Sequence, residues 1–374
     1  MADVFASIPF TIMATGALVG VAASLLGTFL VLRRSSLTTD AIGHAIVLGI
    51  VLVWLATGAT SGPVQLLGAA AAGVATVLLA DALTRTKSVR TDAAIGLVFP
   101  ALFSIGVVLL NVFARSVHID AHTVLLGEIG FIWLDTVSIA GLQVPDALLW
   151  IFVVTILNLV FVTVFFKELE LSTFDPALAT AFGLAPAALG VGLLVLTSVT
   201  AVASFDAVGV VLFVAFAIVP PSAAYLISDR LSHILGISSA IAVASSVSGY
   251  GLAVAMDVSI GGMMAVMTGV FLTLAFLLSP RYGLVAQELR RRADLVLGEN
   301  RALAVHLCQH EDDPNAGEEN VLTALQTHLR WEDNKARKVV ARCVDGGWIL
   351  RDGSRLVLTD MGRAAAIEIL QPSK

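Results

Sequence analysis

The chain has 374 residues, of which 57% are hydrophobic and only 13% are charged. Soluble domains average about 25% charged residues, so this composition excludes an ordinary soluble protein and indicates a membrane protein. The charge is also uneven, because residues 299–374 hold 22 of the 50 Asp, Glu, Lys and Arg residues. An apolar region is therefore followed by a polar tail. Both cysteines, Cys308 and Cys343, lie in the tail, so no disulfide framework is expected.

In chain order, the apolar runs predict nine membrane-spanning helices, each close to the roughly 20 residues that a span requires. These runs cover residues 8–32, 38–57, 64–84, 92–113, 145–166, 186–204, 207–227, 234–256 and 259–279. Residues 122–133 are too short to span and are expected to form a re-entrant or interfacial segment, which leaves the count between eight and ten. Pro220-Pro221 is expected to break the seventh span, either as part of a transport pathway or as a simple kink.

If every predicted span crosses the membrane, the basic residues between the spans are distributed unequally over its two sides. One side carries Arg33, Arg34, Arg85, Lys87, Arg90, Lys167, Arg230 and Arg281. The opposite side carries only Arg115. Because loops rich in Lys and Arg stay in the cytoplasm, the sequence predicts a multi-pass protein of the cell (inner) membrane with a cytoplasmic C-terminus.

Asp40 and His44 are four residues apart in the second predicted span, so they share one face of that helix. Ionisable groups are expensive in hydrocarbon, and those that persist usually line a pathway for a substrate or an ion. A carboxylate and an imidazole together suit Mn(II), Fe(II) or Zn(II). The alternative is that each group only bonds a neighbouring polar group. The rarity of acids at membrane depth favours a metal pathway.

A second candidate metal site lies in the predicted outer segment, at His118, Asp120 and His122. In an extended chain these alternate residues share a face and could bind a metal at the entrance of a pathway. The alternative is an ordinary solvated loop. The second interpretation is favoured, because a short histidine-containing tract only hints at metal binding.

The longest break on the basic side, residues 167–185, contains a predicted short helix. Asp175 is placed to cap its N-terminus, Pro176 occupies its first position and Gly183 ends it. A capped helix between two spans either rests on the lipid headgroups or docks into a cytoplasmic partner.

Six segments recur in the order and spacing of one known family. They are Leu26–Ala45 (LGTFLVLRRSSLTTDAIGHA), Thr91–Phe99 (TDAAIGLVF), Phe166–Ala179 (FKELELSTFDPALA), Ala203–Gly209 (ASFDAVG), Pro220–Leu226 (PPSAAYL) and Ser279–Leu284 (SPRYGL). Over roughly residues 8–285 the chain resembles the permease subunits of ABC importers for manganese, zinc and iron(II), which are relatives of the vitamin B12 and siderophore permeases. One departure is Thr39, where the family often has Gly.

The resemblance implies an all-α polytopic permease of the type II ABC importer kind, with no enzymatic activity of its own. Asp40 and His44 then take the positions of the family's intramembrane metal pair. The resemblance also implies which residues contact the ATPase, namely Phe174, Asp175, Pro176, Ala179 and Gly183. The transported metal is a substrate, and no permanently bound cofactor is expected.

The resemblance also implies partners. The family's permease forms a dimer, here a homodimer or a heterodimer with a paralogue, over two ATPase subunits, and a solute-binding protein delivers the metal outside. The chain contains no G-x-x-x-x-G-K-[ST] sequence, so the ATPase is expected to be a separate polypeptide. The rival interpretation is a stand-alone channel or secondary transporter. The ligand types do not choose among the three metals.

The tail is predicted to follow a membrane domain of residues 1–285 and to comprise a linker helix, residues 286–310, and a small α+β domain, residues 311–374. Helices at 318–329 and 333–345, a hairpin around Gly353 and a last helix at 361–370 resemble a winged helix. Its role is open between regulation, docking onto the ATPase and DNA binding.

DNA binding is disfavoured, because the 12 acids and 10 bases of residues 299–374 leave no net positive charge to neutralise phosphates. We therefore expect no nucleic-acid partner. His306, Cys308 and His310 could sense a metal, but one thiol and two histidines on a helix are interpreted as incidental.

Overall fold

A computed structural model describes residues 7–58, 63–113, 127–139, 142–311 and 316–370. The chain divides into two compact units, residues 1–283 and 284–374. Helix α13 belongs to the second unit. The predicted division of the tail into a linker helix and a separate small domain stays a prediction.

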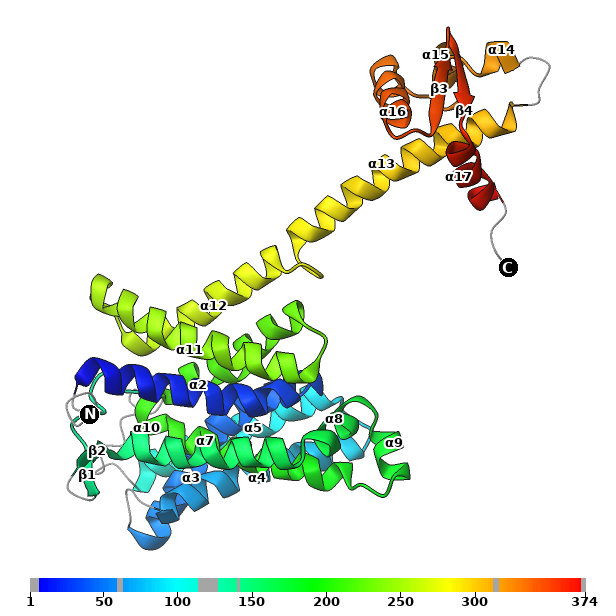
Figure 1. The fold of residues 1–374 in the computed structure, drawn as a ribbon. Helices are drawn as coiled ribbons and strands as arrows, with labels where there is room; N and C mark the ends of the chain where they lie inside the picture. Colours follow the sequence, from blue (N-terminus) through cyan, green and yellow to red (C-terminus); the bar gives the residue numbers. More distant parts are fainter. Residues whose placement is uncertain (1–6, 59–62, 114–126, 140–141, 312–315, 371–374) are drawn as a thin grey trace. The chain divides into compact units, whose positions relative to one another are not determined.

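The first unit is built almost entirely from long helices (Figure 1). They are α2 (Ile8–Leu32), α3 (Leu37–Thr57), α4 (Pro63–Arg85), α5 (Thr91–Phe113), α7 (Asp146–Val164), α10 (Pro186–Ile227), α11 (Leu231–Met256) and α12 (Ile260–Leu278). Two short helices, α8 (Phe166–Phe174) and α9 (Pro176–Ala181), lie between α7 and α10. Within the described residues, nine helical segments are long and apolar enough to cross a membrane, because α10 supplies two, Pro186–Phe205 and Ala207–Ile227. The nine predicted spans are confirmed on length and composition.

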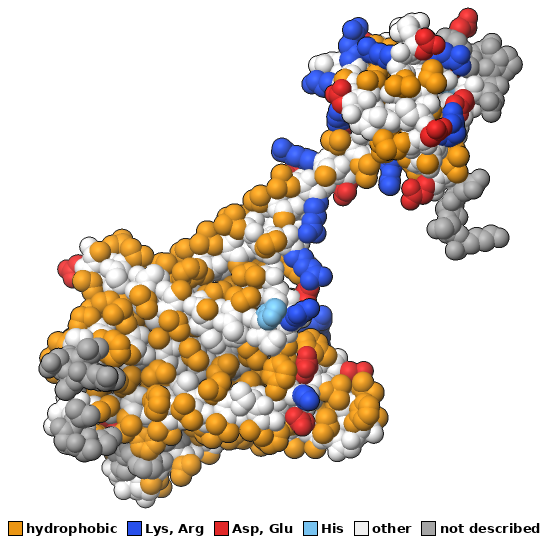
Figure 2. Space-filling model, in the orientation of Figure 1, with side chains coloured by type: hydrophobic (Ala, Val, Ile, Leu, Met, Phe, Trp, Pro, Cys, Tyr) orange, Lys and Arg blue, Asp and Glu red, His pale blue; other side chains and the backbone are white. Residues whose placement is uncertain are grey.

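The surface of this unit is hydrophobic along its flanks. On the face drawn in Figure 2, its Lys and Arg side chains gather at the end that carries α8 and α9. Large side chains such as Phe152, Val160 and Leu274 are exposed on the helices. A soluble protein would bury such a surface, whereas lipid tails solvate it. The fold is that of a multi-pass membrane protein.

The two halves of α10 meet at Gly209, whose backbone is not helical (φ 69°, ψ 172°). The expected break at Pro220-Pro221 is wrong, because α10 continues through both prolines. A proline at position 221 leaves the carbonyl of Ala217 without its helical donor. That carbonyl faces Gly27 of α2, and a Cβ at position 27 would overlap its oxygen. A close helix–helix contact therefore covers the backbone group that the proline leaves unpaired.

Part of the predicted re-entrant segment is described, and its residues 129–133 lie in turns. Gly127 (φ 64°) packs so closely on the backbone of Val208 and Gly209 that a side chain would overlap it. An antiparallel hairpin of β1 (Thr136–Ile139) and β2 (Leu142–Pro145) then leads into α7. This hairpin was not expected from the sequence.

The second unit contains five helices and one antiparallel hairpin in its described part. They are α13 (Leu284–Gln309), α14 (Ala316–Glu319), α15 (Leu322–His328), α16 (Asp333–Asp345), β3 (Ile349–Asp352), β4 (Arg355–Leu358) and α17 (Asp360–Leu370). Leu307, Leu325, Val340, Ile349 and Leu358 meet in a core to which helices and hairpin both contribute. The predicted order of helix, helix, hairpin and helix is observed, except that the first predicted helix, residues 318–329, is divided into α14 and α15.

The contact between α2 and α10 yields a test of the fold. Gly27→Val should destabilise the membrane unit, because its side chain must displace the backbone of α10 rather than a flexible side chain. Overpacking of this kind costs about 1–3 kcal/mol or more. Gly269→Val in α12 is the matched control, since no atom lies within 4 Å of a Cβ built there. Thermal unfolding in detergent should separate the two variants, and equal melting temperatures would contradict this packing.

Candidate metal-transport site

Asp40 lies in the first turn of α3 and His44 one turn further along. The helix brings the His44 Nε2 atom to 3.4 Å from the Asp40 Oδ1 atom. In the single chain the Asp40 side chain is 39% exposed and the His44 side chain is 29% exposed. The predicted pair is therefore formed, and both groups remain accessible to a ligand.

Two aromatic rings of α5 hold the imidazole of His44. Phe99 stacks on it, with ring centroids 5.7 Å apart, and Phe103 meets it edge-on at 5.6 Å. Both phenylalanines come from the central part of α5, which runs from Thr91 to Phe113. The imidazole therefore packs between two helices that are apolar enough to span a membrane, where an ionisable group is costly without a functional reason.

Helix α3 is fixed against α10 between the two candidate ligands. A Cβ at Gly43 would lie 2.8 Å from Cγ1 of Val210, directly after the break at Gly209. Thr39 is fully buried, and its hydroxyl has no hydrogen-bond partner among the described residues. Two protein ligands are too few for a complete coordination shell. Other oxygens, water or a second subunit must complete it.

The outer candidate site lies outside the described residues. His118, Asp120 and His122 belong to residues 114–126. A metal contact there stays a prediction.

The short helix α9 has the predicted caps. The Oδ1 atom of Asp175 accepts a hydrogen bond of 2.9 Å from the backbone N–H of Leu178, and Pro176 is the first helical residue. Gly183 follows in the left-handed region (φ 78°), and the next backbone N–H bonds back to the carbonyl of Ala179. Local sequence alone therefore determines where this helix begins and ends.

The α8–α9 region presents an apolar surface to its surroundings. Phe174 is 59% exposed and Phe182 is 72% exposed, and Leu178 lies between them. Ala179, which the sequence placed among the contact residues, is instead fully buried. The reason is that α9 turns this small residue inward, toward the rest of the unit. The exposed apolar patch of this region consists of Phe174, Leu178 and Phe182.

Arg33 ties this region to the turn that joins α2 and α3. Its Nε atom donates to Oγ1 of Thr173 (3.0 Å), and its Nη2 atom donates to Oγ of Ser172 (2.8 Å). Leu169 of α8 is buried in the same cluster as Phe29 of α2. From the sequence, Arg33 was only one of the basic residues that indicate the cytoplasmic side of the membrane. Its fixed contacts link α8 to the loop that directly precedes the candidate metal ligands.

The fold and the pair define a multi-pass helical membrane protein with a metal-compatible site inside its helices. The chain belongs to the ABC 3 transport family, whose sequence profile matches residues 7–279.

Similar proteins agree with this membership. The zinc transport system membrane protein TroD of Treponema pallidum (strain Nichols) is 42% identical over 348 residues, covering 93% of this chain and 95% of TroD. The manganese transport system membrane protein MntD of Bacillus subtilis (strain 168) is 45% identical over 280 residues, covering 75% of this chain and 95% of MntD. The similarity to TroD therefore extends into the tail.

One solved structure shares the fold of the membrane unit. PsaBC from Streptococcus pneumoniae, solved in complex with Fab, superposes with a TM-score of 0.62 at 26% sequence identity. The match covers 73% of this chain and 92% of the PsaBC chain.

Proposed function

We propose that this chain is the permease subunit of an ABC importer that carries a divalent transition metal, Mn(II), Zn(II) or Fe(II), across the cell membrane. The observation that carries the proposal is the Asp40–His44 pair on a membrane-spanning helix of an ABC 3 family chain. Relatives named as zinc and manganese transport proteins support this class of substrate.

The pair suits transport rather than storage. The carboxylate of Asp40 offsets the charge of a divalent ion, and the imidazole of His44, positioned by Phe99 and Phe103, supplies a nitrogen donor. Two ligands bind weakly enough to release the ion, which a transporter requires. Their partial exposure leaves room for water or for a second permease subunit, in a homodimer or a heterodimer with a paralogue.

ATP hydrolysis occurs in a separate ATPase chain that docks on Phe174, Leu178 and Phe182. Movement of this docking surface reaches α3 through the contacts of Arg33 with Ser172 and Thr173. A solute-binding protein delivers the metal to the opposite end of the membrane unit. The basic residues at the α8–α9 end favour a cytoplasmic position for that end and for the C-terminus (Figure 2). Family membership favours this assembly over a stand-alone channel or secondary transporter.

The tail is proposed to be a winged-helix-like module for regulation or for docking onto the ATPase. Its order of elements and its β3–β4 hairpin support the assignment. The basic charge of α16 is largely offset, because Lys335 and Arg342 both pair with Glu299 and Arg337 pairs with Asp333. The hydrogen bond from Arg342, aided by Lys335, lowers the pKa of Glu299 and keeps it charged at neutral pH. The similarity to TroD over most of this chain supports a tail that a zinc transport protein shares.

Removing either ligand tests the proposed pathway. Asp40→Asn keeps the size of the side chain but loses the charge, and His44→Ala loses the nitrogen donor. Each should lower uptake of radioactive Mn, Zn or Fe by about tenfold or more, since even indirect ligand partners affect metal sites by 10–100-fold. Asp81→Asn is the matched control, because Asp81 forms only an exposed pair with Arg85, and such pairs contribute little.

Detergent-stable assembly is measured in the same preparations. Loss of uptake with normal assembly supports a transport role. Poor assembly together with normal uptake by the surviving complex would assign the pair a structural role instead. Growth rescue of strains deficient in each metal then identifies the substrate.

The docking surface is tested by Phe174→Asp. A buried charge in place of an exposed aromatic contact should cost the complex about 2 kcal/mol or more and uncouple ATP hydrolysis from uptake. Met256→Asp is the control, since Met256 is similarly exposed but lies at the end of α11, and only the beginning of α11 packs in the cluster with Leu169 of α8. ATPase activity and co-purification of the ATPase are measured with intact membrane units. Unchanged coupling in a well-expressed Phe174→Asp variant would reject docking at this surface.

A further inference from the structure

Three histidines of the tail converge on one point. His306 lies in the last turn of α13, His310 directly follows the end of that helix, and His328 ends α15. One ring nitrogen from each can be chosen so that all three lie within 4.8 Å of one another. The sequence singled out the first two with Cys308. In the structure the third member of the cluster is His328, which is distant in sequence, and not Cys308.

The three imidazole rings lie next to one another. Their ring centroids lie 4.9 to 5.9 Å apart. His306 is buried with 5% of its surface exposed, whereas His310 is half-buried and His328 is exposed. The cluster is thus a shallow site with one inner and two outer donors. An ion from solution can reach it.

A carboxylate stands beside the cluster. The Oε2 atom of Glu319 lies 3.0 Å from Nε2 of His328, and the backbone carbonyl of Glu319 lies 3.4 Å from Nε2 of His306. An acidic partner next to a ligating imidazole either orients the ring or serves as a further ligand. Three nitrogens and one carboxylate oxygen make up a tetrahedral set of the kind that Zn(II) takes.

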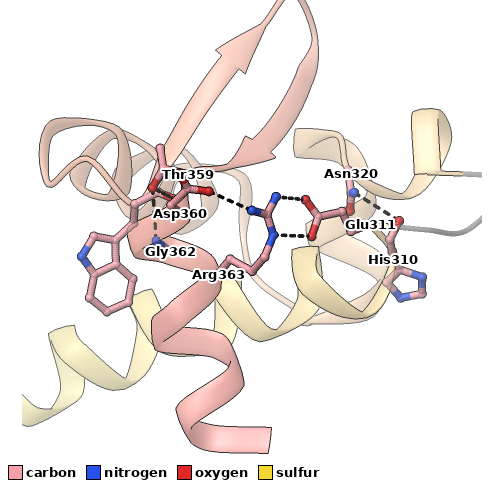
Figure 3. A network of polar contacts seen from close by, with 8 residues as sticks. His310, Glu311, Asn320, Thr359, Asp360, Gly362 and Arg363 are labelled. Carbon is pink, nitrogen blue, oxygen red and sulfur yellow. Dashed lines mark hydrogen bonds and ion pairs between the residues drawn. The ribbon is translucent and has the colours of Figure 1, made fainter.

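The segments that carry these residues are held by polar contacts (Figure 3). Glu311, next to His310, receives two hydrogen bonds from the guanidinium of Arg363 in α17. Asn320, next to Glu319, donates to the backbone carbonyl of His310 at 3.4 Å. The donors are therefore brought together before any ion binds, which reduces the entropy that binding must overcome.

We propose that the tail binds one transition-metal ion through His306, His310 and His328, with Glu319 as orienting or fourth ligand. The imidazole donors favour Zn(II), Co(II) or Ni(II) over Mn(II), which prefers oxygen ligands. Zinc–nitrogen bonds of about 2.0–2.1 Å place tetrahedral nitrogens about 3.4 Å apart, so side-chain rotations close the site. Because it joins α13 to α15, an ion here changes the rigidity of the tail. The tail can thereby respond to metal on its own side of the membrane.

The test uses the full chain, without an affinity tag, carrying Asp40→Asn and His44→Ala so that the membrane pair no longer contributes. Equilibrium dialysis against Zn(II) with elemental analysis measures the zinc bound per chain. Visible absorption after Co(II) loading reports tetrahedral coordination. One equivalent of zinc and a tetrahedral cobalt spectrum are expected. Both should disappear when His310→Ala and His328→Ala are added, and both should persist with His233→Ala, which removes an exposed histidine of α11.

His306 is left intact because it is buried, and its loss could unfold the tail. Thermal unfolding without metal should be the same with and without the two alanine changes, whereas Zn(II) should raise the melting temperature only of the chain with all three histidines. Absence of zinc from the starting background would overturn the proposal. So would zinc binding that survives the loss of His310 and His328.

Discussion

The membrane unit depends on close backbone contact between its helices and α10. In lipid no hydrophobic effect drives helices together, so association relies on small residues that let backbones approach. Gly27 of α2, Gly43 of α3 and Gly73 of α4 all face α10 at positions where a side chain would collide with it. Because Gly43 lies between Asp40 and His44, the contact that builds the fold also positions the candidate metal ligands.

The same arrangement connects the ligands to the basic end of the unit. Arg33 follows α2 directly and precedes α3, and it donates hydrogen bonds to both Ser172 and Thr173 of α8. Any shift of α8 would therefore reach the loop before Asp40 through these two hydrogen bonds. The turn between α2 and α3 thus joins the helix packing of the membrane unit to α8.

Features that depend on local sequence could be predicted, and those that depend on tertiary contacts could not. The nine spans follow from apolar length, and the caps at Asp175 and Gly183 follow from residue type. The burial of Ala179, the break at Gly209 and the approach of His328 to the two histidines at the end of α13 depend on which helices pack together. The break predicted at Pro220-Pro221 is absent from α10. There α2 covers the Ala217 carbonyl that lacks a helical donor.

The central claim is that metal crosses the membrane through this chain only when a separate ATPase drives it. Reconstitution into liposomes with the solute-binding protein present, with and without the ATPase and with and without ATP on the side of the membrane that carries the ATPase, tests it most directly. The account predicts accumulation of Mn(II), Zn(II) or Fe(II) only when ATPase and ATP are both present. Metal accumulation by this chain alone would contradict it and would support a channel or secondary transporter.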